Sequence, residues 1–183
     1  MRVALVVSTL LAAQTAYAEE YSPMILEVPL LILQPRLSYD AMEQYARAIT
    51  KASKPHGLEP LLIASIVRRE SSFSARVAEC RRLGPAREEG LMQIMPRGVA
   101  RRFAIDGCRD ACNPRCSLKM GTGFLAFLRD TPEKLGGCPG STWRWVAGYG
   151  RRRCPTEARA RKCAEVIHAR DFYLSAGGKN WPE

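Results

Sequence analysis

The chain has 183 residues, of which 46% are hydrophobic and 25% are charged, a composition that excludes a disordered or low-complexity protein. Its formal net charge of +10 predicts attraction to polyanions such as cell-wall polymers, lipid headgroups or nucleic acid. Charge alone does not decide among these partners.

The first residues have the features of an export signal. Arg2 precedes an apolar run over 3–13 and the sequence Ala-Tyr-Ala at 16–18, which fits the small-x-small pattern of a signal-peptidase site. The apolar run is shorter than the roughly 20 residues of a spanning helix, which disfavours a membrane anchor. We therefore predict a signal peptide at 1–18, no transmembrane segment after its cleavage, and a periplasmic or secreted protein.

The remaining length suits one domain with its own core. Prolines at 23, 29 and 35 punctuate the segment 19–37, which we interpret as an extended lead-in that packs apolar residues against the domain. We place the domain at 38–178 and a C-terminal tail at 179–183.

Seven cysteines permit at most three disulfides in an oxidising compartment and leave one thiol over. Zinc is an alternative because Cys108, Cys112 and Cys116 recur every four residues. However, CxxC pairs are absent and Pro114 interrupts the run, so structural disulfides are favoured, with a connectivity that the sequence leaves open.

Helical spacing and capping residues predict a mainly α protein with almost no strands. Ser38, Ser117 and Thr156 are candidate caps, and Pro60 suits the first turn of a helix. The segment between 74 and 90 is charged and irregular. The expected helices cover about 39–54, 60–70, 97–103, 117–129, 142–149 and 156–175.

The stretch VRRESSF places Glu70 at the end of the second of these helices. Residues three and four apart share a helix face, so Glu70 lies with Ile66 and Val67 on the apolar stripe, whereas Arg68 and Arg69 point elsewhere. One interpretation is a half-exposed or arginine-paired acid. The other is a buried acid that stays protonated near neutral pH and donates its proton in catalysis.

A second motif, GLMQIMP at 90–96, favours the catalytic interpretation. Together with the aliphatic helix ending in ESSF, it resembles the soluble, goose-lysozyme-like lytic transglycosylases. Weaker similarity continues at Asn113 and the segment 117–125, and at Val-Ala-Gly-Tyr-Gly, 146–150, where Gly150 replaces the family's Asn. The similarity covers about 38–175, excluding a cysteine-rich insert between Phe103 and Ser117.

This resemblance implies a lysozyme-like domain with a glycan-binding groove that cleaves the β-1,4 bond between N-acetylmuramic acid and N-acetylglucosamine. Glu70 corresponds to the catalytic acid, which then acts as base toward the muramoyl 6-hydroxyl and yields a 1,6-anhydro end. No metal or cofactor is needed. A hydrolytic, lysozyme-like outcome would require a second carboxylate, for which Glu88 and Glu89 are candidates.

The same resemblance assigns substrate-binding roles to residues around Glu70. Tyr149 corresponds to a tyrosine that hydrogen-bonds the catalytic acid, and Gln93 offers a donor and an acceptor to acetamido groups. Packing in the core is the competing interpretation for at least one of the methionines. The expected substrate-binding residues are Ser71, Ser72, Met92, Gln93, Met95 and Tyr149.

The expected partner is therefore the glycan strand of peptidoglycan, with no specific nucleic acid. The small single domain has the size of a local wall-opening factor, which suggests an envelope-spanning secretion or conjugation apparatus as a further partner. Two other functions remain open. One is a wall-binding protein without turnover, and the other is a basic secreted protein that binds nucleic acid or lipopolysaccharide.

Overall fold

The structure is a computed structural model that describes residues 26, 30, 34, 36–104, 107–150 and 154–181. Within these ranges the chain forms helices and one isolated bridge, between Glu89 and Ile94, but no strand. The predicted signal peptide lies outside the described residues. The α-helices are α3 (Tyr39–Ser53), α4 (Pro60–Ser71), α5 (Ala75–Ala78), α6 (Pro114–Asp130), α7 (Thr142–Tyr149), α8 (Glu157–Ala160) and α9 (Ala164–Ser175). Short 3-10 helices are η1 (Lys54–His56), η2 (Val99–Phe103) and η3 (Glu133–Leu135).

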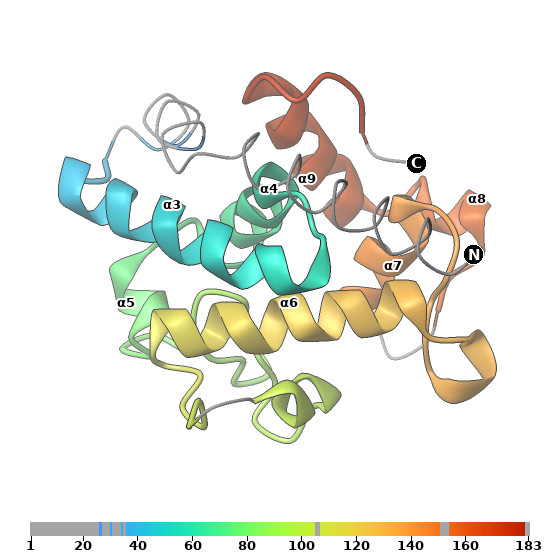
Figure 1. Ribbon diagram of the computed structural model, residues 1–183, viewed down its shortest axis with the longest axis horizontal. Coiled ribbons are helices and arrows are strands. Elements are labelled where there is room, and N and C mark those ends of the chain that lie inside the picture. The colour runs from blue at the N-terminus through green and yellow to red at the C-terminus, as the bar shows by residue number, and fades with distance from the viewer. Residues whose placement is uncertain are drawn as a thin grey trace, which may run out of the picture.

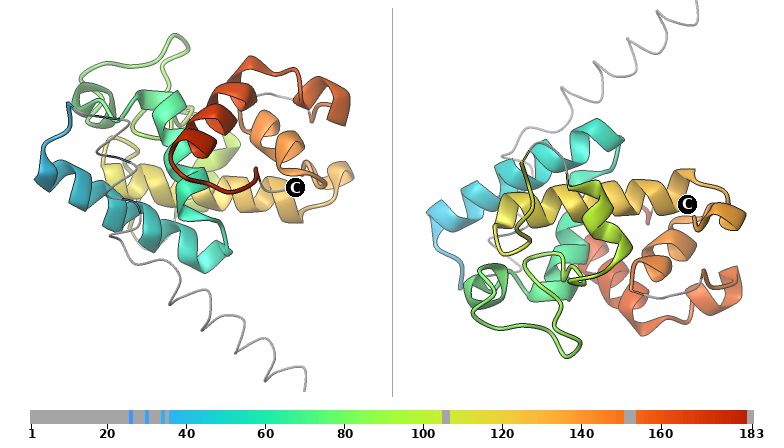
Figure 2. Two further views of the ribbon diagram at one scale, coloured as in Figure 1. Left: turned by 90° about the horizontal axis from the view of Figure 1, so that it is seen from above. Right: turned by 90° about the horizontal axis from the view of Figure 1, so that it is seen from below.

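The long helix α6 crosses the molecule beneath α3 and carries α7 and η2 against its other sides (Figure 1). Helix α4 packs against both α3 and α9, and the left view of Figure 2 shows α9 next to it. Residues 60–67 of α4 are all buried, because α4 is enclosed by its neighbours. None of the described helices is long and apolar enough to cross a membrane.

Helix α4 forms and ends for reasons that are local in the sequence. Pro60 occupies the first turn, where its missing N–H costs nothing. At the other end Ser72 is left-handed, with φ of 53°, and Phe73 follows with φ of 55°. The chain therefore turns sharply just after Glu70, and Phe73 is driven into the core, where its ring lies 5.5 Å from that of Tyr45.

Helix α6 begins three residues before the predicted Ser117. Asn113 is the cap, since its side chain accepts hydrogen bonds from the N–H groups of Arg115 and Cys116, and Pro114 fills the first position. Ser117 is buried inside the helix, and its hydroxyl accepts the N–H of Met92 at 2.9 Å. The capping prediction was wrong because this serine makes a tertiary contact instead.

The single helix predicted over 156–175 is divided into α8 and α9. Cys163 has an extended backbone, with φ of −74° and ψ of 115°, and lies between the two helices. No proline or glycine marks this break. The chain changes direction there because α8 packs against α7, whereas α9 packs against α4 and α7.

Two smaller expectations also needed correction. The helix expected over 97–103 is the 3-10 helix η2, and a short helix, α5, forms within the segment expected to be irregular. In the lead-in, Leu26 and Leu30 have helical rather than extended backbone, although both are buried in the main core as expected.

Three disulfides join Cys80 to Cys112, Cys108 to Cys116, and Cys138 to Cys154. The preference for disulfides over zinc is thereby confirmed. Cys163 is the cysteine left over, and its buried thiol donates to Oε2 of Glu165 at 2.6 Å.

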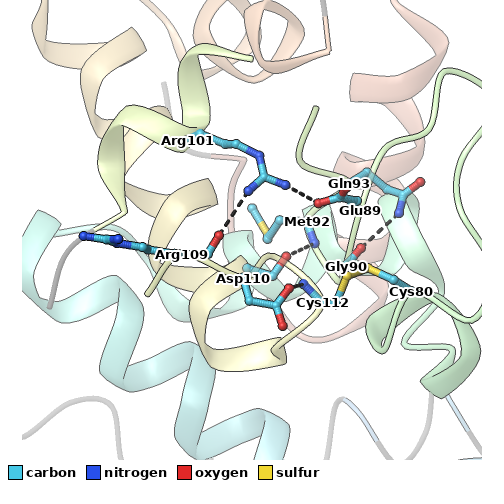
Figure 3. Close-up of a disulfide and its surroundings, with 10 residues drawn as sticks. Cys80, Glu89, Gly90, Met92, Gln93, Arg101, Arg109, Asp110 and Cys112 are labelled. Carbon is cyan, nitrogen blue, oxygen red and sulfur yellow. Dashed lines mark hydrogen bonds and ion pairs between the residues drawn. A yellow bond between two sulfur atoms is a disulfide. The ribbon is translucent and has the colours of Figure 1, made fainter. Parts of the chain in front are cut away.

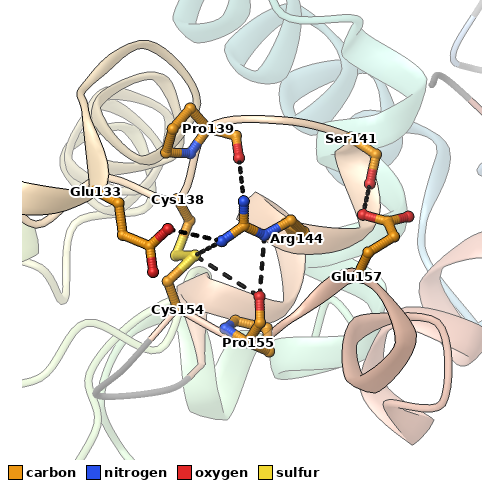
Figure 4. Close-up of polar contacts among 8 residues, drawn as sticks. All are labelled: Glu133, Cys138, Pro139, Ser141, Arg144, Cys154, Pro155 and Glu157. Carbon is orange, nitrogen blue, oxygen red and sulfur yellow. Dashed lines mark hydrogen bonds and ion pairs between the residues drawn. A yellow bond between two sulfur atoms is a disulfide. The ribbon is translucent and has the colours of Figure 1, made fainter.

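The disulfide between Cys138 and Cys154 closes the loops on either side of α7 (Figure 4). Arg144, which belongs to α7, donates to the carbonyls of Pro139 and Pro155 at 2.9 and 3.0 Å. Both loops are thus tied to one guanidinium, which fixes the position of a helix whose last residue reaches the candidate site.

Candidate active site

Glu70 lies in the last turn of α4, and its side chain is only 12% exposed. Its Oε1 accepts a hydrogen bond from Nη1 of Arg69 at 2.5 Å. The expectation that Arg69 points away was therefore wrong. The backbone positions do diverge, but the long side chain of Arg69 bends back to its neighbour.

The pKa of Glu70 is raised from an ordinary value of 4.5 to about 7, and burial is the largest cause. The guanidinium of Arg69 acts in the opposite direction within this net shift, whereas the negative charges of Glu88 and Glu165 contribute to the rise in pKa. Glu70 is thus both buried and paired, a combination of the two interpretations that its sequence position left open. At neutral pH it exchanges readily between the acid and the carboxylate.

Arg69 is held from a second side by α9. Its Nη2 lies 3.8 Å from Oε1 of Glu165, in the first turn of that helix. A Cβ atom added to Gly150 would lie 3.5 and 3.8 Å from the two terminal nitrogens of Arg69. The guanidinium of Arg69 therefore lies against Gly150, at a distance where an added Cβ would make an ordinary van der Waals contact.

The GLMQIMP motif forms a tight hairpin next to the Cys80–Cys112 disulfide (Figure 3). Glu89 and Ile94 exchange two backbone hydrogen bonds, of 2.9 and 2.7 Å. Gln93 is left-handed, with φ of 49°, and its side-chain amide donates to the carbonyl of Gly90 at 2.9 Å.

Gly90 is required by this hairpin for two reasons. Its φ is +72°, and an added Cβ would lie 1.9 Å from the carbonyl oxygen of Ala111. The hairpin therefore packs directly on the segment that leads into α6. This contact and the hydrogen bond from the N–H of Met92 to the hydroxyl of Ser117 fix the position of the hairpin on α6, and so the position of Gln93.

Tyr149 joins the hairpin to α7. Its hydroxyl donates to the carbonyl oxygen of Met92 at 2.8 Å, and its ring lies 5.5 Å from that of Phe124. Burial raises the pKa of Tyr149 well above its ordinary value, and the nearby charge of Glu70 adds to this effect. Because the hydroxyl of Tyr149 donates its hydrogen bond to the carbonyl of Met92, it does not donate one to Glu70 in this structure. The two side chains nevertheless interact electrostatically.

The other expected substrate-binding residues occupy different environments. Ser71 is buried and its hydroxyl donates to the carbonyl of Val67, whereas Ser72 is exposed. Met92 is fully buried and belongs to the core, while Met95 is 40% exposed. The structure thus presents Ser72, Gln93 and Met95 at the surface near the motif, and uses Ser71 and Met92 for internal contacts.

The two candidates for a second carboxylate differ in availability. Glu89 is paired with Arg101, whose other terminal nitrogen donates to the carbonyl of Arg109 (Figure 3). Glu88 accepts the N–H of Ala86 at 2.9 Å, and its charge acts on Glu70. Of the two, Glu88 is the carboxylate coupled to the candidate acid.

Comparison with known proteins decides the family. A model of the transglycosylase SLT domain matches residues 47–158, which include Glu70, the hairpin and Tyr149. The chain belongs to the transglycosylase SLT domain family. The family resemblance and the mainly helical, disulfide-bonded fold expected from the sequence are thereby confirmed.

The chain is also similar to proteins described as membrane-bound lytic murein transglycosylase C. Those from Actinobacillus pleuropneumoniae serotype 5b (strain L20) and serotype 3 (strain JL03) are each 36% identical over 94 residues. The match covers 48% of this chain but only 24% of each relative, so the chain spans a minor part of their length. No solved structure matches significantly.

Sequence reasoning missed Arg69 and Glu165 as members of the site. Arg69 is adjacent to Glu70 in sequence, but helical spacing assigned it to another face. Glu165 lies 95 positions further along the chain, and the packing of α9 on α4 brings it to Arg69. No motif in the sequence pointed to either residue.

Proposed function

We propose that this chain is a peptidoglycan lytic transglycosylase in which Glu70 serves first as the general acid and then as the general base. The observation that carries the proposal is the buried Glu70 carboxyl, with its pKa raised to about 7, inside an SLT domain. A group that must donate a proton and later accept one works best when its pKa lies near the ambient pH.

The reaction proceeds in two balanced steps. Protonated Glu70 gives its proton to the glycosidic oxygen as the bond from that oxygen to C1 of the muramoyl sugar breaks. The muramoyl 6-hydroxyl oxygen then bonds to C1, and its proton passes to the Glu70 carboxylate. The acid is restored, no water is consumed, and the product carries a 1,6-anhydro ring.

Arg69 and Tyr149 support this cycle in different ways. The Arg69 guanidinium stabilises the carboxylate that exists between the two steps, because it lies 2.5 Å from Oε1 of Glu70. Tyr149 keeps the hairpin in register through Met92. Gln93 and Met95 are then available to contact the sugar, and Ser72 lies at the end of the same helix.

The test is mass spectrometry of the fragments that the mature protein releases from purified peptidoglycan. Products lighter than hydrolysed muropeptides by the mass of one water are expected from the wild type, and none from Glu70→Gln. Glu70→Gln should still sediment with peptidoglycan sacculi. Retained cleavage in that variant would exclude Glu70 as the catalytic acid.

A hydrolytic muramidase is the second candidate, and it is favoured by the coupling between Glu88 and Glu70. In that reaction water attacks C1 and the products keep full-mass reducing ends. Glu88→Gln separates the two reactions, since it should abolish hydrolysis but leave anhydro products. The expected site of action is the periplasm or cell exterior, where a secretion or conjugation apparatus is a candidate partner.

A further inference from the structure

A pocket lies close to Glu70, between the end of α4 and the middle of α9. Its volume is about 330 Å³, at the lower end of the roughly 300–1,000 Å³ usual for small-ligand sites. The described residues that line it are Arg68, Arg69, Ser72, His168 and Phe172. Its lining residues come from α4, from Ser72 just after α4, and from α9, which packs against α4.

Hydrogen-bond donors dominate the lining, and none of the described lining residues is acidic. Arg68 donates through Nη1 to the hydroxyl of Ser72 at 2.8 Å and makes no ion pair with any described carboxylate. His168 is exposed and adds ring nitrogens to the same wall. This composition suits a planar anion, which a guanidinium binds through two parallel hydrogen bonds.

Arg69 connects this pocket with the candidate active site. Arg69 is one of the lining residues, and its guanidinium contacts Glu70 at 2.5 Å and Glu165 at 3.8 Å. An anion in the pocket is therefore separated from the reacting acid by one side chain. The ligand is thus expected to be part of the molecule being cleaved, rather than an unrelated solute.

We propose that the pocket binds a carboxylate of the peptide stems that peptidoglycan carries on its muramoyl sugars. This inference rests on the proposed function, because it assumes that the glycan lies at Glu70. Phe172 supplies an apolar surface for the aliphatic part of such a peptide. A phosphate would satisfy the donors, but it would not account for the aromatic wall or the link to Glu70.

The experiment compares kcat/KM on intact peptidoglycan with kcat/KM on glycan strands from which the peptides have been removed enzymatically. The wild type should prefer the stem-bearing substrate. Arg68→Ala should reduce this preference about tenfold, the low end of the effect of a hydrogen bond to a charged group. Arg68→Lys keeps the positive charge but loses the two parallel hydrogen bonds of a guanidinium. Its preference for the stem-bearing substrate should therefore lie between those of the wild type and Arg68→Ala.

Arg159→Ala is the matched control, since it removes the same charge from an exposed position on α8. Arg159→Ala should reduce the preference for the stem-bearing substrate only by the effect of removing one positive surface charge, which is smaller than the effect of Arg68→Ala. A preference ratio that is unchanged in Arg68→Ala would overturn the proposal, as would equal reductions in Arg68→Ala and Arg159→Ala.

If the wild type cleaves neither substrate, the proposed function fails and the pocket is tested by binding alone. Calorimetry with a synthetic stem tripeptide then decides. Binding to the wild type that is weakened in Arg68→Ala supports the pocket, and no binding overturns it. Displacement of the tripeptide by inorganic phosphate at equal concentration would assign the site to phosphate and also overturn it.

Discussion

Glu70→Gln should alter how the stability of the protein depends on pH. A carboxyl with a pKa of about 7 in the fold and 4.5 when unfolded binds its proton more tightly in the fold. Its contribution to stability is complete below pH 4.5 and is lost as the pH rises through about 7. At about 1.4 kcal/mol for each pKa unit, the loss amounts to about 3 kcal/mol.

Glutamine does not titrate, so the variant should escape this loss. We expect Glu70→Gln to gain about 3 kcal/mol relative to the wild type between pH 4 and pH 8, as measured by urea unfolding at both values. Screening reduces the effect little, because the side chain is only 12% exposed. The comparison between two pH values cancels any effect of the substitution that is independent of pH.

Glu79→Gln is the control, since Glu79 is 54% exposed and is paired with Arg81 at the surface. Its stability relative to the wild type should stay nearly constant over the same range. If Glu70→Gln also differs from the wild type by a constant amount from pH 4 to pH 8, Glu70 does not have a raised pKa. The reasoning that makes it an acid at neutral pH would then be refuted.

Three further substitutions test the surroundings of this acid. Arg69→Ala removes the charge that lowers the pKa of Glu70, so the decline of kcat/KM at high pH should move to higher pH in a pH–rate profile. Gly121→Ala places a Cβ atom 2.5 to 2.8 Å from three atoms of buried Met92, and thermal unfolding should show a loss of about 1–3 kcal/mol. Tyr149→Phe removes the 2.8 Å hydrogen bond to Met92, which should cost about 1 kcal/mol in urea unfolding and lower kcat.

The helices that could be predicted are those whose signals are local. Pro60 at a first turn marks the start of α4, and the predicted limits of α7 agree with the structure. Glu70 was identified in the same way, because ESSF and GLMQIMP are short motifs that can be recognised in the sequence without knowledge of how the helices pack. Oxidising conditions and cysteine number predicted the three disulfides but not their pairing.

Errors arose where a residue had a choice between a local and a distant partner. Ser117 has the chemistry of a cap, but its hydroxyl binds Met92, 25 positions away. Cys163 interrupts a segment with helical spacing because α9 packs on α4 as well as on α7, whereas α8 packs on α7. Tyr149 was expected to donate a hydrogen bond to Glu70, but its hydroxyl donates to the carbonyl of Met92 instead.

The sequence by itself determined the family, the helical class and the identity of the candidate acid. Tertiary structure alone decided the electrostatic environment of that acid. Its pKa depends on burial by surrounding helices and on Arg69, Glu88 and Glu165 together. Electrostatic energy varies with distance and with the surrounding dielectric, and neither quantity is recorded in the spacing of residues along a chain.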